Sequence, residues 1–187
     1  MNLMQQIRIE KITLNIGAGD AGDKLNKAAT LLEKLTGRKS VKTITMQRIP
    51  AWGVRPKLPI GVKLTLRGKK AEEILRRLFK ANENKLSIRK FDKSGNFSFG
   101  IKEYLDIPEV EYDPSIGVIG LEVAITLERP GFRIKRRKLQ KSKIGKKHLI
   151  TKEDAQEFIK NKFNVELVES SEEEQWLTAV MIRLLSS

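Results

Sequence analysis

The chain has 187 residues, enough to bury one sizeable hydrophobic core, and its 37 Lys and Arg against 23 Asp and Glu give a net charge of +14. It contains no Cys, which excludes disulfides and thiolate metal sites and fits a reducing compartment. Its start, MNLMQQIRIEK, has no apolar export signal, and no stretch approaches the ~18 apolar residues of a membrane span, so we expect a cytoplasmic protein without a membrane partner.

A strand is predicted over residues 7–16. Apolar and polar residues alternate there, which is typical of a strand with one buried face and one polar face. The side chains on the polar face are Lys11, Thr13 and Asn15.

A glycine motif, G-x-G-x-x-G, follows this strand at Gly17, Gly19 and Gly22. Dinucleotide-binding loops have this spacing, so a nucleotide-binding enzyme is an alternative function. The alternating strand opposes it, because the strand before such a loop is normally parallel and continuously apolar. Asp20 and Asp23 would repel an anionic ligand, and they suit a helix N-terminus without one. We therefore expect an ordinary strand–turn–helix.

The next predicted elements are a helix over residues 24–36, ended by Gly37, a strand over 41–47 and a loop over 48–59. Lys42 is the basic residue that we place on the polar side of this strand. The loop is rich in proline and carries basic side chains and an aromatic one, namely Arg48, Trp52, Arg55 and Lys57.

A third strand is predicted over residues 60–68, followed by an amphipathic helix over 69–82. The polar side of this strand presents Lys63, Thr65 and Arg67. A turn at 94–96 then leads into a strand, and the most apolar strand is predicted over 116–128.

Residues 129–147 contain ten Lys or Arg and no acidic residue. Thr151 and Asp154 have the spacing of a capping box before a helix over 151–161, and a last strand is predicted over residues 162–168. The order of these elements predicts an α+β fold, a largely antiparallel sheet with helices covering one face and an open polar face. Because the chain is so basic, we expect RNA or DNA on that open face rather than a merely soluble basic surface.

Catalytic chemistry is not indicated by any motif. The single histidine, His148, stands beside two lysines and is expected to be solvated or to contact phosphate. No phosphate-binding loop, zinc motif, nucleophile elbow or metal-ligand spacing is present, so we expect a non-enzyme with no catalytic residue, no metal and no cofactor.

Four segments carry a resemblance to one family: RIEKITLNIGAG, PIGVKLTLRG, FDKSGNFSFGIKE and IPEVEYDPSIGVIGLEVAITLERPG. From about residue 7 to 168 the chain resembles the large-subunit ribosomal protein number five family, which binds 5S ribosomal RNA. The segment RRKLQKSKIGKKHLITKEDAQEFI is similar to an extension of archaeal and eukaryotic members that bacterial members lack.

The resemblance implies a structural constituent of the large ribosomal subunit that helps attach 5S ribosomal RNA in the central protuberance. The implied partners are 5S and large-subunit ribosomal RNA, other central-protuberance proteins and a small-subunit head protein across an intersubunit bridge. Contact with the elbow of P-site tRNA is a further expectation.

The resemblance also implies site residues. Asn15, Arg38, Trp52 and Thr65 stand where the family places 5S RNA contacts. Gln is common at the position of Arg38 and Phe at that of Trp52, so Arg38 suits a phosphate rather than a base or sugar edge, whereas Trp52 keeps an ability to stack. The loop 48–59 would face tRNA, although an ordinary rigid connection is the alternative.

The stretch 129–149 is expected to form a basic extension that grips large-subunit RNA and orders on binding. Its candidate RNA-binding residues are Arg133, Lys135, Arg136, Arg137, Lys138, Lys141, Lys143, Lys146 and Lys147. We expect residues 1–168 to form a single RNA-binding domain that includes this extension.

Residues 169–187 have no counterpart in the resemblance. They are acidic at first and then apolar at helical spacing, which predicts an amphipathic helical tail. Such a tail could dock on the domain, bind a protein partner or be foreign to the family, so an adaptor function through this helix is a second alternative.

Overall fold

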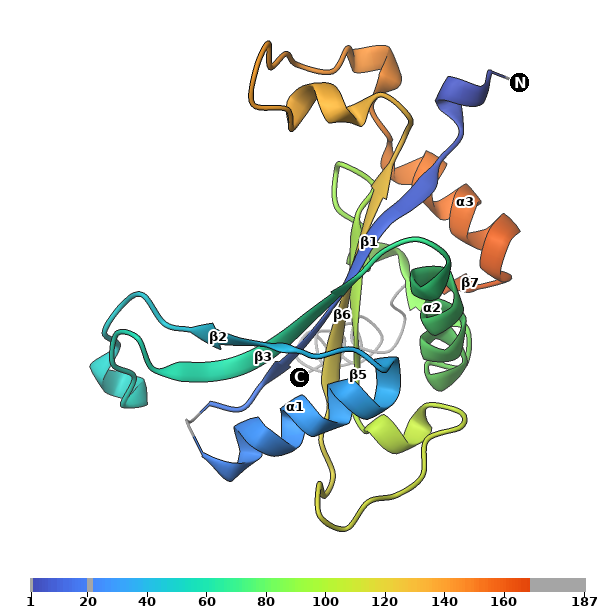
Figure 1. Cartoon of the computed structure of the whole chain (residues 1–187). Helices are drawn as coiled ribbons and strands as arrows, with labels where there is room; N and C mark the ends of the chain where they lie inside the picture. The colour runs from blue at the N-terminus through green and yellow to red at the C-terminus, as the bar shows by residue number, and fades with distance from the viewer. Residues whose placement is uncertain (1, 20–21, 169–187) are drawn as a thin grey trace, which may run out of the picture.

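The computed structural model describes residues 2–19 and 22–168, with the exception of the Trp52 side chain. Five strands form one antiparallel sheet with the order β2-β3-β1-β6-β5 (Figure 1). Their bounds are β1 Arg8–Gly17, β2 Val41–Ile44, β3 Pro59–Leu66, β5 Phe97–Ile101 and β6 Leu121–Glu128. Together with three helices, this sheet confirms the predicted α+β class with its largely antiparallel sheet.

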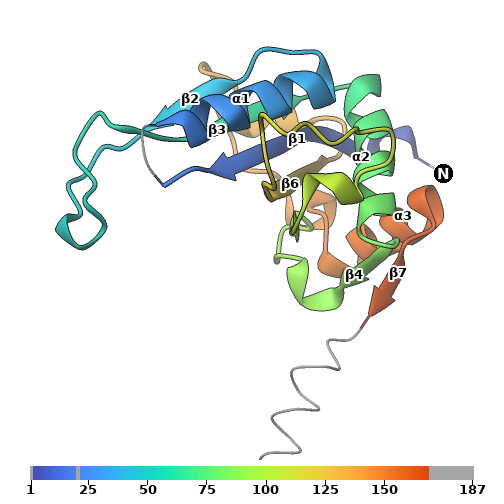
Figure 2. The same ribbon diagram turned by 90° about the horizontal axis from the view of Figure 1, so that it is seen from below.

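The helices α1 (Asp23–Thr36) and α2 (Lys69–Ala81) lie along one side of this sheet, α1 against β3 and β1 and α2 against β1 (Figures 1 and 2). Every second residue of the long strands turns its side chain toward them. In β1 these are Ile12, Leu14 and Ile16, which are 3% exposed or less. The predicted alternation of buried and polar residues is therefore correct.

The third helix, α3 (Lys152–Phe163), begins as its sequence predicts. The Thr151 hydroxyl accepts a hydrogen bond from the Asp154 backbone N–H at 3.2 Å. In return, Asp154 Oδ2 accepts one from the Thr151 N–H at 3.1 Å. This capping box satisfies two N–H groups that the helix itself leaves unpaired.

A second, two-stranded parallel sheet joins β4 (Lys85–Ser87) to β7 (Glu166–Val168). The predicted last strand is thus present as β7. Its partner β4 is only three residues long and follows α2 closely, too short for alternation to be recognised in sequence.

Two predicted strands are shorter than expected. The segment 116–128 is extended only from Leu121, because Gly117 has a left-handed φ of 75° and the chain turns there. The segment 41–47 pairs with β3 only as far as Ile44, where the register shifts. Beyond this point the β2–β3 hairpin reaches away from the rest of the fold (Figure 1).

The glycine motif lies at the end of β1, which pairs in an antiparallel sense with both β3 and β6. The backbone N–H groups of Ala18 and Gly19 both donate to the Ile60 carbonyl, at 2.9 and 3.1 Å. These amides are therefore already hydrogen-bonded within the fold, unlike those that cradle a pyrophosphate. Asp20 lies outside the described residues, and Asp23 is the first residue of α1. The structure thus has the ordinary strand–turn–helix.

In the described part of the chain, no helix is long and apolar enough to cross a membrane.

Candidate nucleic-acid interface

The face of the sheet opposite α1 and α2 presents the remaining side chains of each strand. Strand register aligns them in rows that run across the sheet, because directly paired residues point to the same side. One row consists of Val41, Lys63, Asn15, Glu122 and Gly100. The next row consists of Thr65, Thr13, Ala124 and Ser98.

These rows bring four of the expected site residues side by side. Asn15 pairs directly with Lys63, and Thr13 with Thr65, so their Cβ atoms lie at the ~5 Å separation typical of cross-strand neighbours. Lys11 precedes them on β1, opposite Thr126 of β6. The result is a mixed surface of cations and hydrogen-bonding groups, the combination that contacts the phosphates and base edges of a nucleic acid.

An acidic residue that was not among the expected site residues also lies on this face. Asn15 Nδ2 donates a hydrogen bond to Glu122 Oε2 at 3.1 Å. This contact fixes the orientation of the Asn15 amide, which leaves its Oδ1 available as an acceptor. The Glu122 carboxylate would repel a phosphate, but it can accept hydrogen bonds from an exocyclic amino group of a base.

Two adjoining hollows, of about 540 and 460 Å³, lie over the small residues of β5 and β6 on this face. Both are lined by Asn15, Gly100, Glu122 and Lys90. Lys90 comes from the short 3-10 helix Ile88–Lys90, which the sequence pattern did not reveal. Its side chain adds a cation near Glu122, over strands β5 and β6 of the open face.

Lys42 does not lie on this open face, so our placement of it was wrong. It pairs with Val62, whose side chain is fully buried on the helix side, and its Nζ donates to Asn26 Oδ1 of α1 at 3.0 Å. Adjacent residues of a strand point to opposite faces, so Val41 and Thr43 lie on the open side and Lys42 does not.

Arg38 lies in the connection between α1 and β2. It follows Gly37, which ends α1 in a left-handed conformation with φ 66°. Its side chain is exposed, three residues before Val41, the member of the open face that pairs with Lys63. Arg67 likewise is exposed and comes directly after β3.

The loop 48–59 forms the tip of the β2–β3 hairpin (Figure 1). Backbone hydrogen bonds between Ile49 and Val54, at 3.0 and 3.1 Å, close a small turn that contains the 3-10 helix Pro50–Trp52. The expected tRNA-facing side chains of Arg48, Arg55 and Lys57 are exposed, whereas that of Trp52 lies outside the described structure.

The basic extension folds back on the sheet through Arg136. Its guanidinium makes ion pairs with Glu10 and with Glu128, and the Glu128 side chain is only 8% exposed. Arg8 pairs with the same Glu128 carboxylate at 2.7 Å. The Arg136 side chain is 43% exposed, so these ion pairs give it a structural role at the surface, and its contact with RNA stays a prediction.

His148 holds the base of the extension. Its Nε2 lies 2.8 Å from the Pro130 carbonyl oxygen, an acceptor, so Nε2 carries the proton of this contact. The ring also packs edge-on against Phe132, with centroids 5.7 Å apart. His148 is thus a partly buried packing residue rather than a fully solvated one, and the phosphate contact that we expected stays a prediction.

The other predicted basic side chains of the extension are exposed: Arg133, Lys135, Arg137, Lys138, Lys141, Lys143, Lys146 and Lys147. Arg137 Nε donates to the Gln140 carbonyl at 2.8 Å, and Lys135 Nζ lies 5.0 Å from the Phe132 ring centroid. That the extension orders on binding RNA stays a prediction.

Comparison with known proteins assigns the chain to a family. Residues 2–55 match the family model described as ribosomal protein L5, and residues 59–158 match the model for the C-terminus of the same ribosomal family. These models define a class, the ribosomal proteins, in accordance with the basic α+β fold.

The relatives that match the chain over most of its length include archaeal proteins named large ribosomal subunit protein uL5. The protein from Sulfurisphaera tokodaii is 52% identical over 170 residues, which cover 90% of this chain and 96% of the relative. That from Methanococcus maripaludis strain C5 is 50% identical over 168 residues, 88% of this chain and 93% of the relative. That from Nanoarchaeum equitans is 49% identical over 166 residues, 88% and 98% respectively.

The chain therefore belongs to the uL5 family of large-subunit ribosomal proteins. This confirms the resemblance inferred from the four sequence segments, and with it a structural rather than an enzymatic role in the ribosome.

Proposed function

We propose that the chain binds 5S ribosomal RNA through the open face of its sheet and helps attach it in the central protuberance of the large subunit. The observation that carries this proposal is the pairing of Asn15 with Lys63 and of Thr13 with Thr65 on the face opposite the helices. Membership of the uL5 family and a net charge of +14 support the same function.

The residues of this face contribute to RNA binding in two ways. Lys11, Lys63 and Arg67 neutralise phosphates, which supplies affinity without sequence preference. Asn15 and Thr65 hydrogen-bond to base or sugar edges, which supplies the preference for the cognate RNA. The described open face carries no aromatic side chain in its two central rows, so stacking of bases is not its main device.

Other surfaces bind the other partners. The exposed cations of the basic extension contact large-subunit ribosomal RNA. The hairpin tip with Arg48, Arg55 and Lys57 contacts the elbow of P-site tRNA. The domain of residues 1–168 also adjoins other central-protuberance proteins and, across an intersubunit bridge, a protein of the small-subunit head. This work takes place in the cytoplasm.

A competition assay tests the central proposal. Labelled 5S ribosomal RNA from a related archaeon is bound at ~0.15 M salt, where charge-driven binding is already weakened, and is challenged with excess unrelated structured RNA. We expect 5S RNA to be retained by a factor of about one hundred or more, a threshold below the ~10³–10⁷ by which specific binding typically exceeds non-specific binding. Equal displacement by both RNAs would show that charge alone acts, and would refute the proposal.

A further inference from the structure

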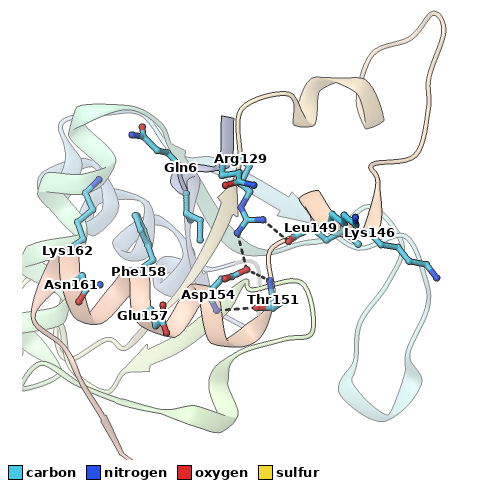
Figure 3. A pocket seen from close by; sticks show the side chains of 13 residues that line it. Gln6, Arg129, Lys146, Leu149, Thr151, Asp154, Glu157, Phe158, Asn161 and Lys162 are labelled. Atoms are coloured by element: carbon cyan, nitrogen blue, oxygen red, sulfur yellow. Dashed lines mark hydrogen bonds and ion pairs between the residues drawn. The ribbon is translucent and has the colours of Figure 1, made fainter. Parts of the chain in front are cut away.

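A hollow of about 790 Å³ lies away from the open face, between the N-terminal segment, the base of the extension and α3 (Figure 3). Its size falls in the ~300–1,000 Å³ range of small-ligand sites. Its lining combines one aromatic ring, several amides and several cations. Apart from the two lysines of the extension, these groups have no role in the function proposed above.

Arg129 is the fixed polar group of this hollow. Its guanidinium donates to the Leu149 carbonyl and to Asp154 Oδ2, both at 3.0 Å, and its side chain is only 11% exposed. Figure 3 shows both contacts at the wall of the hollow. The Nε–H of Arg129 is buried and has no hydrogen-bond partner among the described residues. Because this N–H is buried, it is not open to a ligand, and the two contacts hold the guanidinium as a fixed part of the wall.

Two amides and a ring face the same space. The side chains of Gln6 and Asn161 make no hydrogen bond to any residue that the structure describes, so their donors and acceptors remain available. The Phe158 ring, which projects from α3 into the hollow (Figure 3), is partly buried, and the Lys162 ammonium lies over it, 5.5 Å from its centroid. An amide pairs with the edge of a base, and an aromatic ring stacks on its face.

The rim of the hollow is positively charged. Lys146 and Lys147 are exposed and have no ion pair among residues 2–19 and 22–168. The two acids of the lining differ, because Asp154 is neutralised by Arg129 whereas Glu157 is exposed. Such a rim attracts a phosphate, while Glu157 can accept from an exocyclic amino group.

We propose that this hollow binds a single unstacked nucleotide of ribosomal RNA. The base stacks on Phe158, its edge pairs with Asn161 or Gln6, and the adjoining phosphates of the RNA backbone contact Lys146 and Lys147. The proposal rests on the ribosomal function proposed above, but it concerns a surface that is separate from the 5S-binding face.

The test is a titration of the ¹⁵N-labelled full chain with single-stranded RNA pentamers of A, C or U, followed by NMR. We expect at least one pentamer to shift the side-chain amide signals of Gln6 and Asn161 saturably. Phe158→Leu should then weaken this binding about tenfold or more, as expected for loss of base stacking, while Phe158→Tyr should retain it. Asn161→Ala, at an exposed position that leaves the core intact, should weaken it severalfold.

Two results would overturn the proposal. One is that the shifts are confined to the open sheet face, and the other is that Phe158→Leu and Asn161→Ala bind like the unmodified chain. A nucleoside 5′-monophosphate serves as the second probe, and the assignment to RNA requires that it bind more weakly than the best pentamer. Equal binding would mean that the hollow takes a free nucleotide instead.

The matched control is Thr65→Ala on the open face. It should leave the shifts at the hollow unchanged while it reduces the preference for 5S RNA in the competition assay. The proposals for the hollow and for the open face can therefore be refuted independently, the first by the NMR titration and the second by the competition assay.

Discussion

Asn15 and Lys63 lie directly opposite each other on β1 and β3, on the face of the sheet that turns away from α1 and α2. The same Asn15 amide donates to Glu122 on the other neighbouring strand. A cation, an amide and a carboxylate therefore stand in one row across three strands. The effect of a substitution on this face depends on which of the three groups it changes.

Removing a cation from the open face should weaken binding to every RNA by a similar factor. For Lys63→Gln we expect lower affinity for 5S and unrelated RNA alike, and a salt slope reduced by about 0.7–0.9 for each phosphate that the variant no longer neutralises. Lys42→Gln is the matched control, because it removes the same charge from the helix side, where Lys42 pairs with Asn26. Filter binding at several salt concentrations measures the RNA affinity and the salt slope of both variants. An equal decrease in RNA affinity for the two variants would mean that the open face contributes no more to RNA binding than the helix side does.

Removing a hydrogen-bonding group should instead reduce discrimination. We expect Asn15→Ala and Thr65→Val each to lower the preference for 5S RNA by about 1–3 kcal/mol, the range known for base-edge contacts in duplexes. Affinity for unrelated RNA should change little, since the charge is preserved. The quantity to measure is the ratio of the dissociation constants for unrelated RNA and for 5S RNA. The assignment of these residues fails if that ratio stays at its original value.

Removing the acidic group should have the opposite effect. Glu122→Gln keeps an oxygen acceptor for Asn15 but removes a negative charge from the row beside Lys63. We therefore expect tighter binding of all RNAs at low salt and a smaller gain at high salt. Glu33→Gln, at an exposed position on α1, makes the same charge change away from the face and should alter affinity less. Equal gains would show that only net charge matters.

The sequence pattern predicted the strands and helices well where alternation or helical spacing extends over many residues, as in β1, β3 and α2. It placed Lys42 incorrectly, because β2 is only four residues long and both of its faces carry exposed residues. In such a strand the hydrophobic pattern does not decide which side is inward, and only the register with β3 does so.

Contacts between distant segments could not be predicted in this way. Ten basic residues in a run suggested a surface made for RNA, yet Arg136 is held by Glu10 and Glu128. Glu10 is 126 residues from Arg136 in the sequence, and only the fold brings the two together. Lys90 was missed for a related reason, since it lies in a short 3-10 helix with no periodic pattern.

The Arg136 ion pairs provide a test of the extension's attachment. Arg136→Gln should lower the free energy of unfolding by about 1–3 kcal/mol, because the nearly buried Glu128 carboxylate then keeps only Arg8 as its partner. Arg133→Gln should change stability by less than ~0.5 kcal/mol, since its side chain is exposed, and should instead weaken RNA binding. Urea unfolding and RNA binding of both variants would separate the two roles. The same stability for both would argue against the anchoring contact.

Acid stability offers the last test, at a site far from the sheet face. Hydrogen bonds from Lys34 and then from Ser115 lower the pKa of Asp113 from its ordinary value of 3.8 to about 2 in the folded protein. A group whose pKa is lower when folded stabilises the fold above its unfolded pKa, and this contribution is lost as the pH falls through the folded pKa. The stabilisation by Asp113 should therefore be complete above about pH 4 and should disappear toward pH 2.

Asp113→Asn removes this contribution at every pH. We expect the variant to have a lower melting temperature than the unmodified chain at pH 5, and the two melting temperatures to converge as the pH is lowered toward 2. Asp106→Asn is the control, because the Asp106 side chain is exposed and has no ion pair in the described part of the chain. Calorimetry at four or five pH values gives the melting temperature of each protein as a function of pH. A constant difference between variant and unmodified chain over this interval would mean that the Lys34–Asp113 contact does not link protonation to folding.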